Sequence, residues 1–167
     1  QTWAATHGVE WIILRPTLIY GHGQDKNIAE IARFIRRFGF FPLLGSAKGL
    51  RQPIHVEDVA SACYGALNTL NLINRSYNLT GEETLSYREM VKRIFEALNL
   101  PPRMLTIPLW FFQIAAWGLN CLPRYRNWTP AMAERMNQDL TFDYSDAKQD
   151  LNFSPRSFKL TTEDLPG

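Results

Sequence analysis

The sequence predicts an α/β fold organised on a parallel sheet. Residues 9–14 are β-branched or aromatic at most positions and show no polar/apolar alternation, which is typical of a strand buried on both faces. Pro16 follows and cannot donate to a sheet ladder, so we expect this strand to end there. Strand-like runs and stretches of helical periodicity then follow one another along the chain, as an α/β fold requires.

The segment after Pro16 is a candidate ligand site. It leaves the sheet through residues 17–20 and reaches the glycines of Gly21-His22-Gly23. Ligands of open α/β sheets bind at the carboxyl ends of the strands, where this segment would lie. An ordinary buried strand followed by a glycine turn has the same pattern, so both interpretations stay open.

Caps and periodicity define the elements of the first half. Residues 1–7 resemble a helix end, and Gly8 stands at the position of a C-terminal cap. Asp25 can cap a helix over residues 27–38, which carries apolar residues at helical spacing: Ile28, Ile31, Ala32, Ile35 and Phe38. Its other face carries Arg33, Arg36 and Arg37. We interpret these arginines as a solvated face in preference to a phosphate site.

Residues 40–45 and 50–56 are expected to be extended. Glu57-Asp58 would then cap a helix over residues 59–70, with five residues facing the core: Val59, Ala62, Cys63, Ala66 and Leu67. Residues 75–79 indicate another strand. Ser86 and Glu89 form a capping box for a helix over residues 87–98. Extended residues 103–107 precede helices at 109–122 and 130–137, and residues 143–148 open a short helix that ends near Leu151.

Composition excludes several classes of function. The 167 residues suffice for one domain with a core, and a formal charge of +2 without a basic run gives no electrostatic footprint for nucleic acid. Cys63 and Cys121 lie in apolar surroundings without metal-ligand spacing. We therefore expect no metal site, and buried free thiols in a reducing, cytoplasmic compartment.

Four stretches, taken in order, resemble the C-terminal half of an extended short-chain dehydrogenase/reductase. That family contains NAD(P)-dependent nucleotide-sugar epimerases and dehydratases. The stretches are residues 14–23 (LRPTLIYGHG), 51–60 (RQPIHVEDVA), 77–81 (YNLTG) and 146–155 (DAKQDLNFSP). The resemblance implies that residues 1–167 form a single C-terminal unit: the last part of a Rossmann-type parallel sheet and a mixed α/β substrate-binding lobe. The N-terminal dinucleotide-binding part would be absent.

The resemblance also implies site residues. Backbone groups of Pro16, Thr17, Leu18 and Ile19 would lie against the nicotinamide of NAD or NADP, a cofactor held mainly by the missing half. Asn27 would hydrogen-bond the diphosphate of a nucleotide sugar, and Arg51 would clamp its phosphates. A plain capping role for Asn27 and an exposed loop position for Arg51 are the alternatives.

The chain also departs from the family. It contains no Gly-x-x-Gly-x-x-Gly turn, and the resemblance implies that the family's Tyr-x-x-x-Lys pair would lie in the missing half, on the helix whose tail is residues 1–5, so we assign no catalytic residue and expect the chain alone to be inactive. No lysine stands four residues after Tyr20, which excludes it as the family's catalytic tyrosine. We interpret His55 as a hydrogen-bonded structural histidine and Asp58 as a helix cap. The parent protein is expected to form a homodimer.

The apolar stretch at residues 108–122 leaves a second function open. Its apolar core, residues 109–122, is 14 residues long and contains Gln113 and Asn120, too short and too polar to span a bilayer. It predicts an apolar pocket, or docking on a membrane surface or partner; a core helix is the alternative. The resemblance therefore implies one of two functions: an epimerase, dehydratase or reductase, or a non-catalytic or atypical relative that acts as a dinucleotide-binding scaffold or on a lipid-like or quinone-like substrate.

Overall fold

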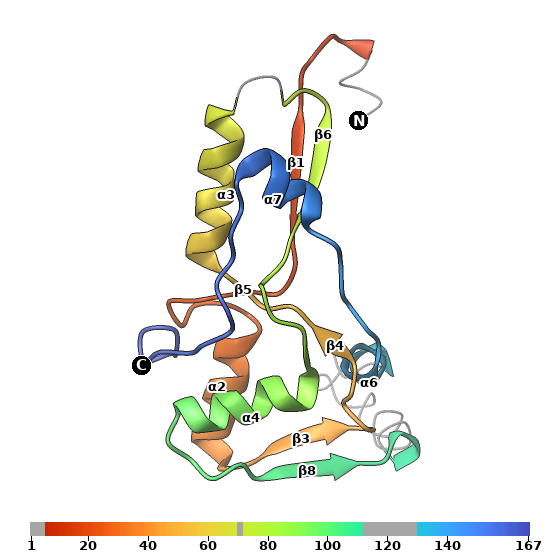
Figure 1. Ribbon diagram of the computed structural model, residues 1–167. Coiled ribbons are helices and arrows are strands. Elements are labelled where there is room, and N and C mark those ends of the chain that lie inside the picture. Colours follow the sequence, from red (N-terminus) through yellow and green to blue (C-terminus); the bar gives the residue numbers. More distant parts are fainter. Residues whose placement is uncertain (1–5, 70–71, 112–129) are drawn as a thin grey trace.

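The computed structural model describes residues 6–69, 72–111 and 130–167, and Figure 1 shows them arranged in two parts. The upper part contains β1 (Ile12–Pro16) and β6 (Arg75–Leu79), packed with α3 (Val56–Asn68) and α7 (Ser145–Leu151). The lower part contains α2 (Ile28–Phe38), α4 (Tyr87–Ala97), α6 (Pro130–Asn137), β3 (Phe41–Leu44) and β8 (Met104–Ile107). Four short strands lie between them: β2 (Ile19–Tyr20), β4 (Leu50–Arg51), β5 (Ile54–His55) and β7 (Leu85–Ser86).

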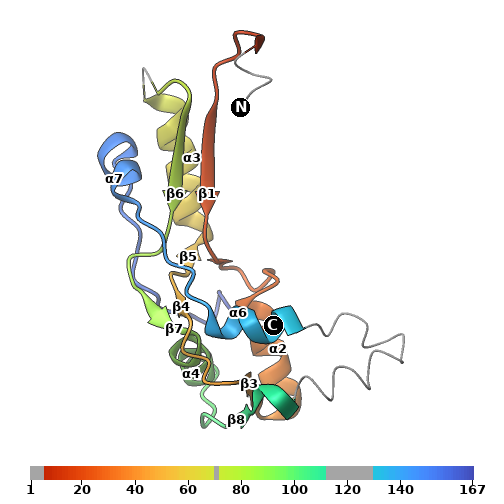
Figure 2. The same ribbon diagram turned by 90° about the vertical axis from the view of Figure 1, so that its right-hand side faces the viewer.

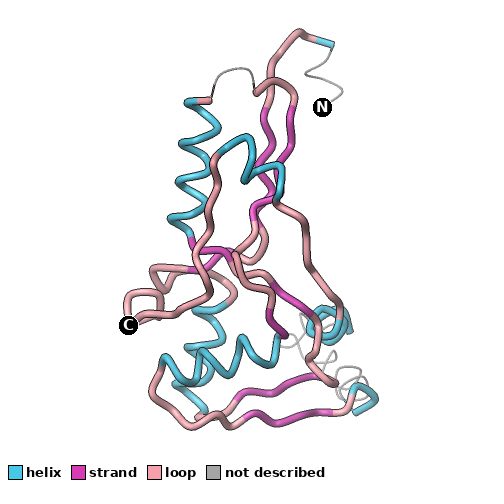
Figure 3. Tube along the Cα trace, viewed as in Figure 1, coloured by secondary structure: helices cyan, strands magenta, loops and turns pink. Residues whose placement is uncertain are grey.

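Parallel pairing dominates among the described strands. β1 pairs with β6, β2 with β5 and β3 with β8 in parallel, and β4 pairs with β7 in antiparallel fashion. Figure 3 shows that long loop segments join the two parts, one rising from α6 to α7 and one descending from α7 to the C-terminus. The predicted α/β class is confirmed.

The first strand is displaced from its predicted position. It covers Ile12–Pro16 instead of residues 9–14, although it does end at Pro16 as expected. The expectation that it is buried on both faces is wrong for the described residues, since Ile12 to Leu14 are half-buried and Arg15 and Pro16 are exposed. Figure 2 shows the reason: α3 lies behind β1 and β6, and no described element covers their opposite face.

The helix predicted at residues 59–70 begins earlier than expected from the acidic pair Glu57-Asp58. α3 starts at Val56, and its N-cap is His55, so the prediction that Glu57-Asp58 caps it is wrong. Ala62 and Ala66 are buried, but Cys63 is exposed and Leu67 is 86% exposed, which contradicts their predicted core positions. The helix packs on one side of a narrow sheet, so only one stripe of it is covered.

Each of the two parts has an apolar cluster of its own. The lower cluster joins α2, α4 and β3 to the C-terminal residues Phe158 and Leu165, which pack with Tyr20. The upper cluster joins β6, α3 and α7 through Tyr77, Ala62 and Leu151. The helices predicted at 27–38, 87–98, 130–137 and up to Leu151 are found close to their expected bounds, whereas the helix end predicted at residues 1–7 lies mostly outside the described residues. Phe38, however, is 51% exposed instead of facing the core, because it is the last residue of α2 and extends past the packed turns.

Most of the predicted apolar helix at 109–122, and Cys121, lie outside the described residues. Its first residues, Leu109, Trp110 and Phe111, are 41%, 63% and 55% exposed. Within the described ranges no helix is long and apolar enough to cross a membrane.

Candidate functional site

The loop after β1 is fixed at the carboxyl edge of the parallel pair. The Thr17 N–H donates to the Leu79 carbonyl at 2.9 Å, and the Thr17 hydroxyl donates to the Gln52 carbonyl at 2.5 Å. Leu18 accepts from the Ile54 N–H at 2.9 Å. Pro16 is exposed, and Thr17, Leu18 and Ile19 are half-buried. The four predicted cofactor residues thus form one rigid, largely apolar ledge beside the ends of β1 and β6.

The end of β6 is pressed against the segment before β5. A Cβ at Gly81 would lie 1.9 Å from the Pro53 carbonyl oxygen, so only glycine permits this approach. The Gly81 N–H donates to the Gln52 carbonyl at 3.4 Å, the same oxygen that Thr17 contacts. Gln52 therefore links both strand ends to the ledge.

Asn27 occupies the N-cap position of α2, but its side chain does not cap the helix. Its side chain makes no capping hydrogen bond; instead Asp25 Oδ1 accepts from the N–H groups of Asn27 at 2.8 Å and Ala29 at 3.1 Å. The predicted capping role of Asp25 is confirmed, and the capping alternative for Asn27 is excluded. The exposed Asn27 amide stays available for a ligand, but the Asp25 carboxylate already occupies the positive end of the helix.

Arg51 is buried, with 4% of its surface exposed, so the exposed-loop alternative is wrong. Its Nη1 donates to the carbonyl oxygens of Leu50 and Gln138 at 2.7 Å each, and its Nη2 donates to the Arg135 carbonyl. The Tyr87 ring lies 5.8 Å from the guanidinium carbon. Burial lowers the pKa of Arg51 from its ordinary value, against the opposing influence of Tyr87 and Asp139. A phosphate at this position would have to share the guanidinium with backbone carbonyls.

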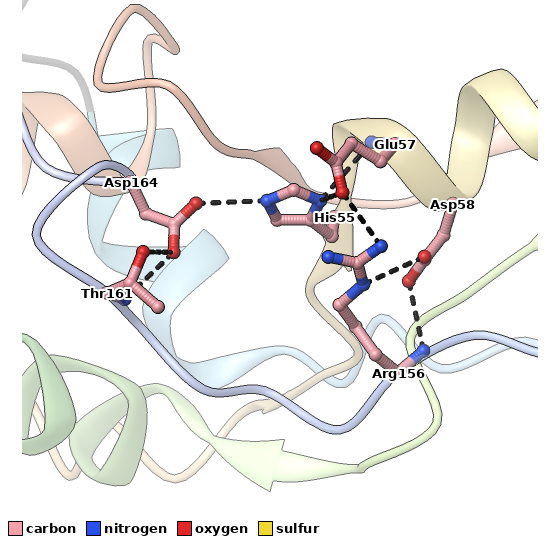
Figure 4. A network of polar contacts seen from close by, with 6 residues as sticks. All are labelled: His55, Glu57, Asp58, Arg156, Thr161 and Asp164. Atoms are coloured by element: carbon pink, nitrogen blue, oxygen red, sulfur yellow. Dashed lines mark hydrogen bonds and ion pairs between the residues drawn. The ribbon is translucent and has the colours of Figure 1, made fainter.

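His55 is the centre of a polar network shown in Figure 4. Its Nδ1 accepts from the Glu57 N–H at 3.3 Å, which places the ring proton on Nε2, and Nε2 lies 2.9 Å from Asp164 Oδ1. Asp164 Oδ2 accepts from the N–H and the hydroxyl of Thr161 at 2.8 Å each. The predicted structural role of His55 is thereby confirmed.

Asp58 holds the C-terminal segment instead of capping α3. Its Oδ2 accepts from the Arg156 N–H and its Oδ1 from Arg156 Nε, both at 2.9 Å. Arg156 Nη2 also lies 2.9 Å from Glu57 Oε2. The predicted cap role of Asp58 is wrong because the side chain of His55 already accepts the free N–H group.

The Tyr20 ring packs edge-on against the His55 ring, with 5.1 Å between the ring centroids, and Tyr20 is not arranged as a base. Burial, reinforced by the charges of Asp164 and Asp58, raises the pKa of Tyr20 to about 12. Its hydroxyl makes no hydrogen bond of normal geometry within the described residues, although the Lys159 backbone lies close enough to lower the pKa slightly. A phenol with such a pKa stays neutral at physiological pH.

A cavity of about 410 Å³ opens between α3 and the C-terminal segment. His22, His55, Arg156 and Lys159 line it together with Glu57, Glu163 and Asp164, and none of the predicted cofactor or substrate residues contributes. Two cations, Arg156 and Lys159, lie there beside three carboxylates, Glu57, Glu163 and Asp164, so the lining offers no excess of positive charge to a phosphate. The described residues contain no cluster of three side chains suited to a metal.

Sequence reasoning missed Asp164 and Arg156. No local pattern marks them, because Asp164 meets a histidine 109 residues away. The structure places the predicted ledge against the Gln52 carbonyl and the neighbouring Arg51 against the end of α6, whereas Asn27 stands apart at the start of α2.

Comparison with known proteins agrees with this architecture. Residues 1–80 match the model of the NAD dependent epimerase/dehydratase family. The solved UDP-glucose 4-epimerase of Thermotoga maritima with UDP-glucose aligns with a TM-score of 0.68 at 19% identity, over 98% of this chain and 45% of that chain. The dTDP-glucose 4,6-dehydratase of Bacillus anthracis in complex with NAD aligns with a TM-score of 0.65 at 18% identity, over 98% and 44%. At 18–19% identity, these alignments show a shared fold alone.

One curated relative is named as a subunit of NADH dehydrogenase and not as an epimerase or dehydratase. The chain is 28% identical over 100 residues to the mitochondrial NADH dehydrogenase [ubiquinone] 1 alpha subcomplex subunit 9 of Arabidopsis thaliana, covering 59% of this chain and 25% of that protein. The chain spans 25–44% of the length of the curated relatives that it matches. The resemblance predicted from the sequence is confirmed: residues 1–80 carry the NAD-dependent epimerase/dehydratase family pattern, on the Rossmann-type fold of solved epimerases and dehydratases.

Proposed function

We propose that this chain is the substrate-facing part of an NAD(P)-dependent nucleotide-sugar epimerase or dehydratase. The observation that carries the proposal is the ledge of Pro16 to Ile19, fixed at the carboxyl edge of a parallel sheet by both hydrogen bonds of Thr17. A flat nicotinamide ring fits a rigid apolar surface of this kind. The glycine-rich turn that would bind the pyrophosphate is not in this sequence, so the fit extends to the nicotinamide side only.

When bound, the dinucleotide supplies a hydride acceptor or donor. The residues of this chain position the partners: the ledge holds the ring, Asn27 hydrogen-bonds the substrate diphosphate, and Arg51 supplies a cation to its phosphates. The free Asn27 amide supports its part of this assignment. Arg51 has its Nε–H and one Nη2–H left beyond its three carbonyl contacts.

The cofactor assignment is tested by NAD(H) binding to the full-length protein with Thr17→Val. Loss of the hydroxyl bond to Gln52 releases the ledge, so the Kd for NADH rises about fivefold, the equivalent of one hydrogen bond. Thr69→Val is the matched control, because among the described residues the Thr69 hydroxyl bonds the Gly65 carbonyl of the helix that it follows and nothing in the ledge. Equal Kd values for both variants would refute the assignment.

The substrate assignment is tested by UDP binding to Asn27→Ala. Because Asp25 provides the cap, this variant keeps the stability of α2, and any loss of affinity reports a direct contact. A threefold or greater rise in the Kd supports the role of Asn27. Unchanged affinity would remove Asn27 from the substrate site.

A second function, assembly on a membrane or in a larger complex without catalysis, is favoured by a different observation. Leu109, Trp110 and Phe111 are exposed together at the start of the uncharged stretch 108–122, and one relative is a subunit of NADH dehydrogenase. Flotation with anionic vesicles tests it, comparing the full-length protein with Trp110→Ser. Recovery with vesicles that depends on Trp110 supports this function, and no recovery excludes the membrane form of it.

A further inference from the structure

Arg51 is a buried cation that forms no direct ion pair among the described residues, although the charge of Asp139 acts on its guanidinium from nearby. None of the ion pairs found between described side chains includes it. Its charge is met by neutral carbonyl oxygens and by the face of the Tyr87 ring. Hydrogen bonds to an ionised acceptor are stronger than bonds to carbonyls, so a phosphate would be a better partner for this guanidinium.

The oxygens that now hold Arg51 come mainly from the end of α6. Arg135 lies in the last turn of that helix and Gln138 directly follows it, and the C-terminal carbonyls of a helix carry its partial negative charge. Arg51 therefore caps α6, and the end of α6 occupies donors that an anion would use.

Other contacts dock α6 without involving Arg51. Asn137 Nδ2 donates to the Leu44 carbonyl at 2.8 Å, and Asn137 Oδ1 accepts from the Ala47 N–H at 3.0 Å. Asp139 Oδ1 accepts from the Leu50 N–H at 2.8 Å, and the Leu140 N–H donates to the Leu50 carbonyl at 3.0 Å. A substitution at Asn137 can therefore weaken the docking of α6 while the Arg51 side chain itself stays unchanged.

We infer that the end of α6 and the diphosphate of the substrate compete for Arg51, so that α6 is an internal inhibitor of substrate binding. This inference rests on the proposed role of Arg51. It makes two linked statements: a nucleoside diphosphate loosens the end of α6, and a weakened α6 contact tightens the binding of the diphosphate.

The first experiment measures UDP binding to the full-length protein by calorimetry, with Asn137→Ala as the test variant. Loss of the Asn137 contacts raises the fraction of molecules in which α6 has left Arg51, and the Kd for UDP falls about fivefold. Asn68→Ala is the matched control, because within the described part of the chain the Asn68 amide bonds the Tyr64 carbonyl of its own helix and lies outside the α6 contacts. Arg51→Ala should raise the Kd at least tenfold.

The second experiment needs no variant. Hydrogen exchange of the Gln138 and Leu140 amides, which bond Glu134 and Leu50, is measured with and without UDP. Competition predicts faster exchange at both amides when UDP is bound, whereas a ligand that only stabilises the fold slows exchange.

The outcomes separate the two proposals. If Arg51→Ala loses affinity but Asn137→Ala binds UDP no more tightly than the wild type, and UDP slows exchange at α6, the competition is refuted and the phosphate role of Arg51 survives. If the wild type does not bind UDP, or Arg51→Ala binds it equally well, the phosphate role itself is refuted, and the competition with it.

Discussion

Nε2 of His55 and Oδ1 of Asp164 lie 2.9 Å apart and join the start of α3 to the C-terminal segment. Both side chains are buried. Burial alone would raise the pKa of the Asp164 carboxyl, but hydrogen bonds from Thr161 and His55 outweigh it, so this pKa lies below its ordinary value. The contact is therefore a pH-dependent part of the stability of the fold.

We predict that Asp164 contributes about 1 kcal/mol to the free energy of unfolding at neutral pH. Because the folded pKa is depressed, the contribution is fully present above the unfolded pKa of about 3.9 and is lost as the pH falls through the folded pKa. Urea unfolding of the full-length protein at pH 3 to 7 measures it. Asp164→Asn should flatten the acid side of the profile, and Glu163→Gln, an exposed neighbour, should leave it unchanged; identical profiles for both would contradict the prediction.

Gly81→Ala should destabilise the protein by about 2 kcal/mol or more, because its Cβ would lie 1.9 Å from the Pro53 carbonyl oxygen and push β6 away from the Gln52 carbonyl. Thermal unfolding measures the loss, and NADH binding should weaken as the ledge shifts. Gly167→Ala, with no heavy atom within 4 Å of the added carbon, serves as the control. A wild-type melting temperature for Gly81→Ala would show that the approach is less close than described.

Tyr20 and Tyr77 offer a matched pair. Both side chains are buried, but only the Tyr77 hydroxyl has a partner of normal geometry, Asp150 Oδ2 at 2.8 Å. We predict that Tyr77→Phe costs about 1 kcal/mol, whereas Tyr20→Phe is neutral or slightly stabilising, because no bond is lost. Chemical denaturation distinguishes them, and an equal loss in both variants would mean that Tyr20 has a partner.

The Glu83–Arg93 pair should give a measurable coupling although it is partly exposed. Two bonds of 2.6 and 2.7 Å join them, and the Arg93 hydrogen bond lowers the pKa of Glu83 against the effect of burial. With about a third of each side chain exposed, screening limits the coupling energy to about 0.5–1 kcal/mol. A double-mutant cycle with glutamine at both positions measures it, and the value should fall with added salt. The Lys92–Glu96 pair, at 3.6 Å and more exposed, is expected to give almost none.

Sequence reasoning succeeded where the determinants are local. Ser86 accepts from the Glu89 N–H at 3.1 Å as the capping box predicts, and the helical spacing from Ile28 onward gave the correct bounds of α2. It failed for Cys63 and Leu67, since an apolar residue on a helix does not reveal whether another layer covers that face. Burial of a strand or helix is a property of its neighbours.

In the candidate site, too, the features with local determinants could be predicted from the sequence, and those set by distant residues could not. The ledge after Pro16 could be placed from sequence because a proline and two glycines mark the strand exit. The surroundings of Arg51 could not, because its partners Arg135 and Gln138 are more than eighty residues away and act through backbone oxygens, which no side-chain pattern records. Likewise, Asp25 and Asn27 both suit a cap, and only backbone geometry decided between them.

The return of the C-terminal segment also has a consequence for synthesis of the protein. Phe158 and Leu165 complete the cluster that contains Tyr20, a residue made near the start of this chain, and the backbone of Leu165 lies against Gly23. A growing chain that has emerged only as far as α7 still lacks this closing layer. The lower part therefore folds to completion only after residues 158–165 have been translated, and a chain truncated before Phe158 would leave an open core for proteases to recognise.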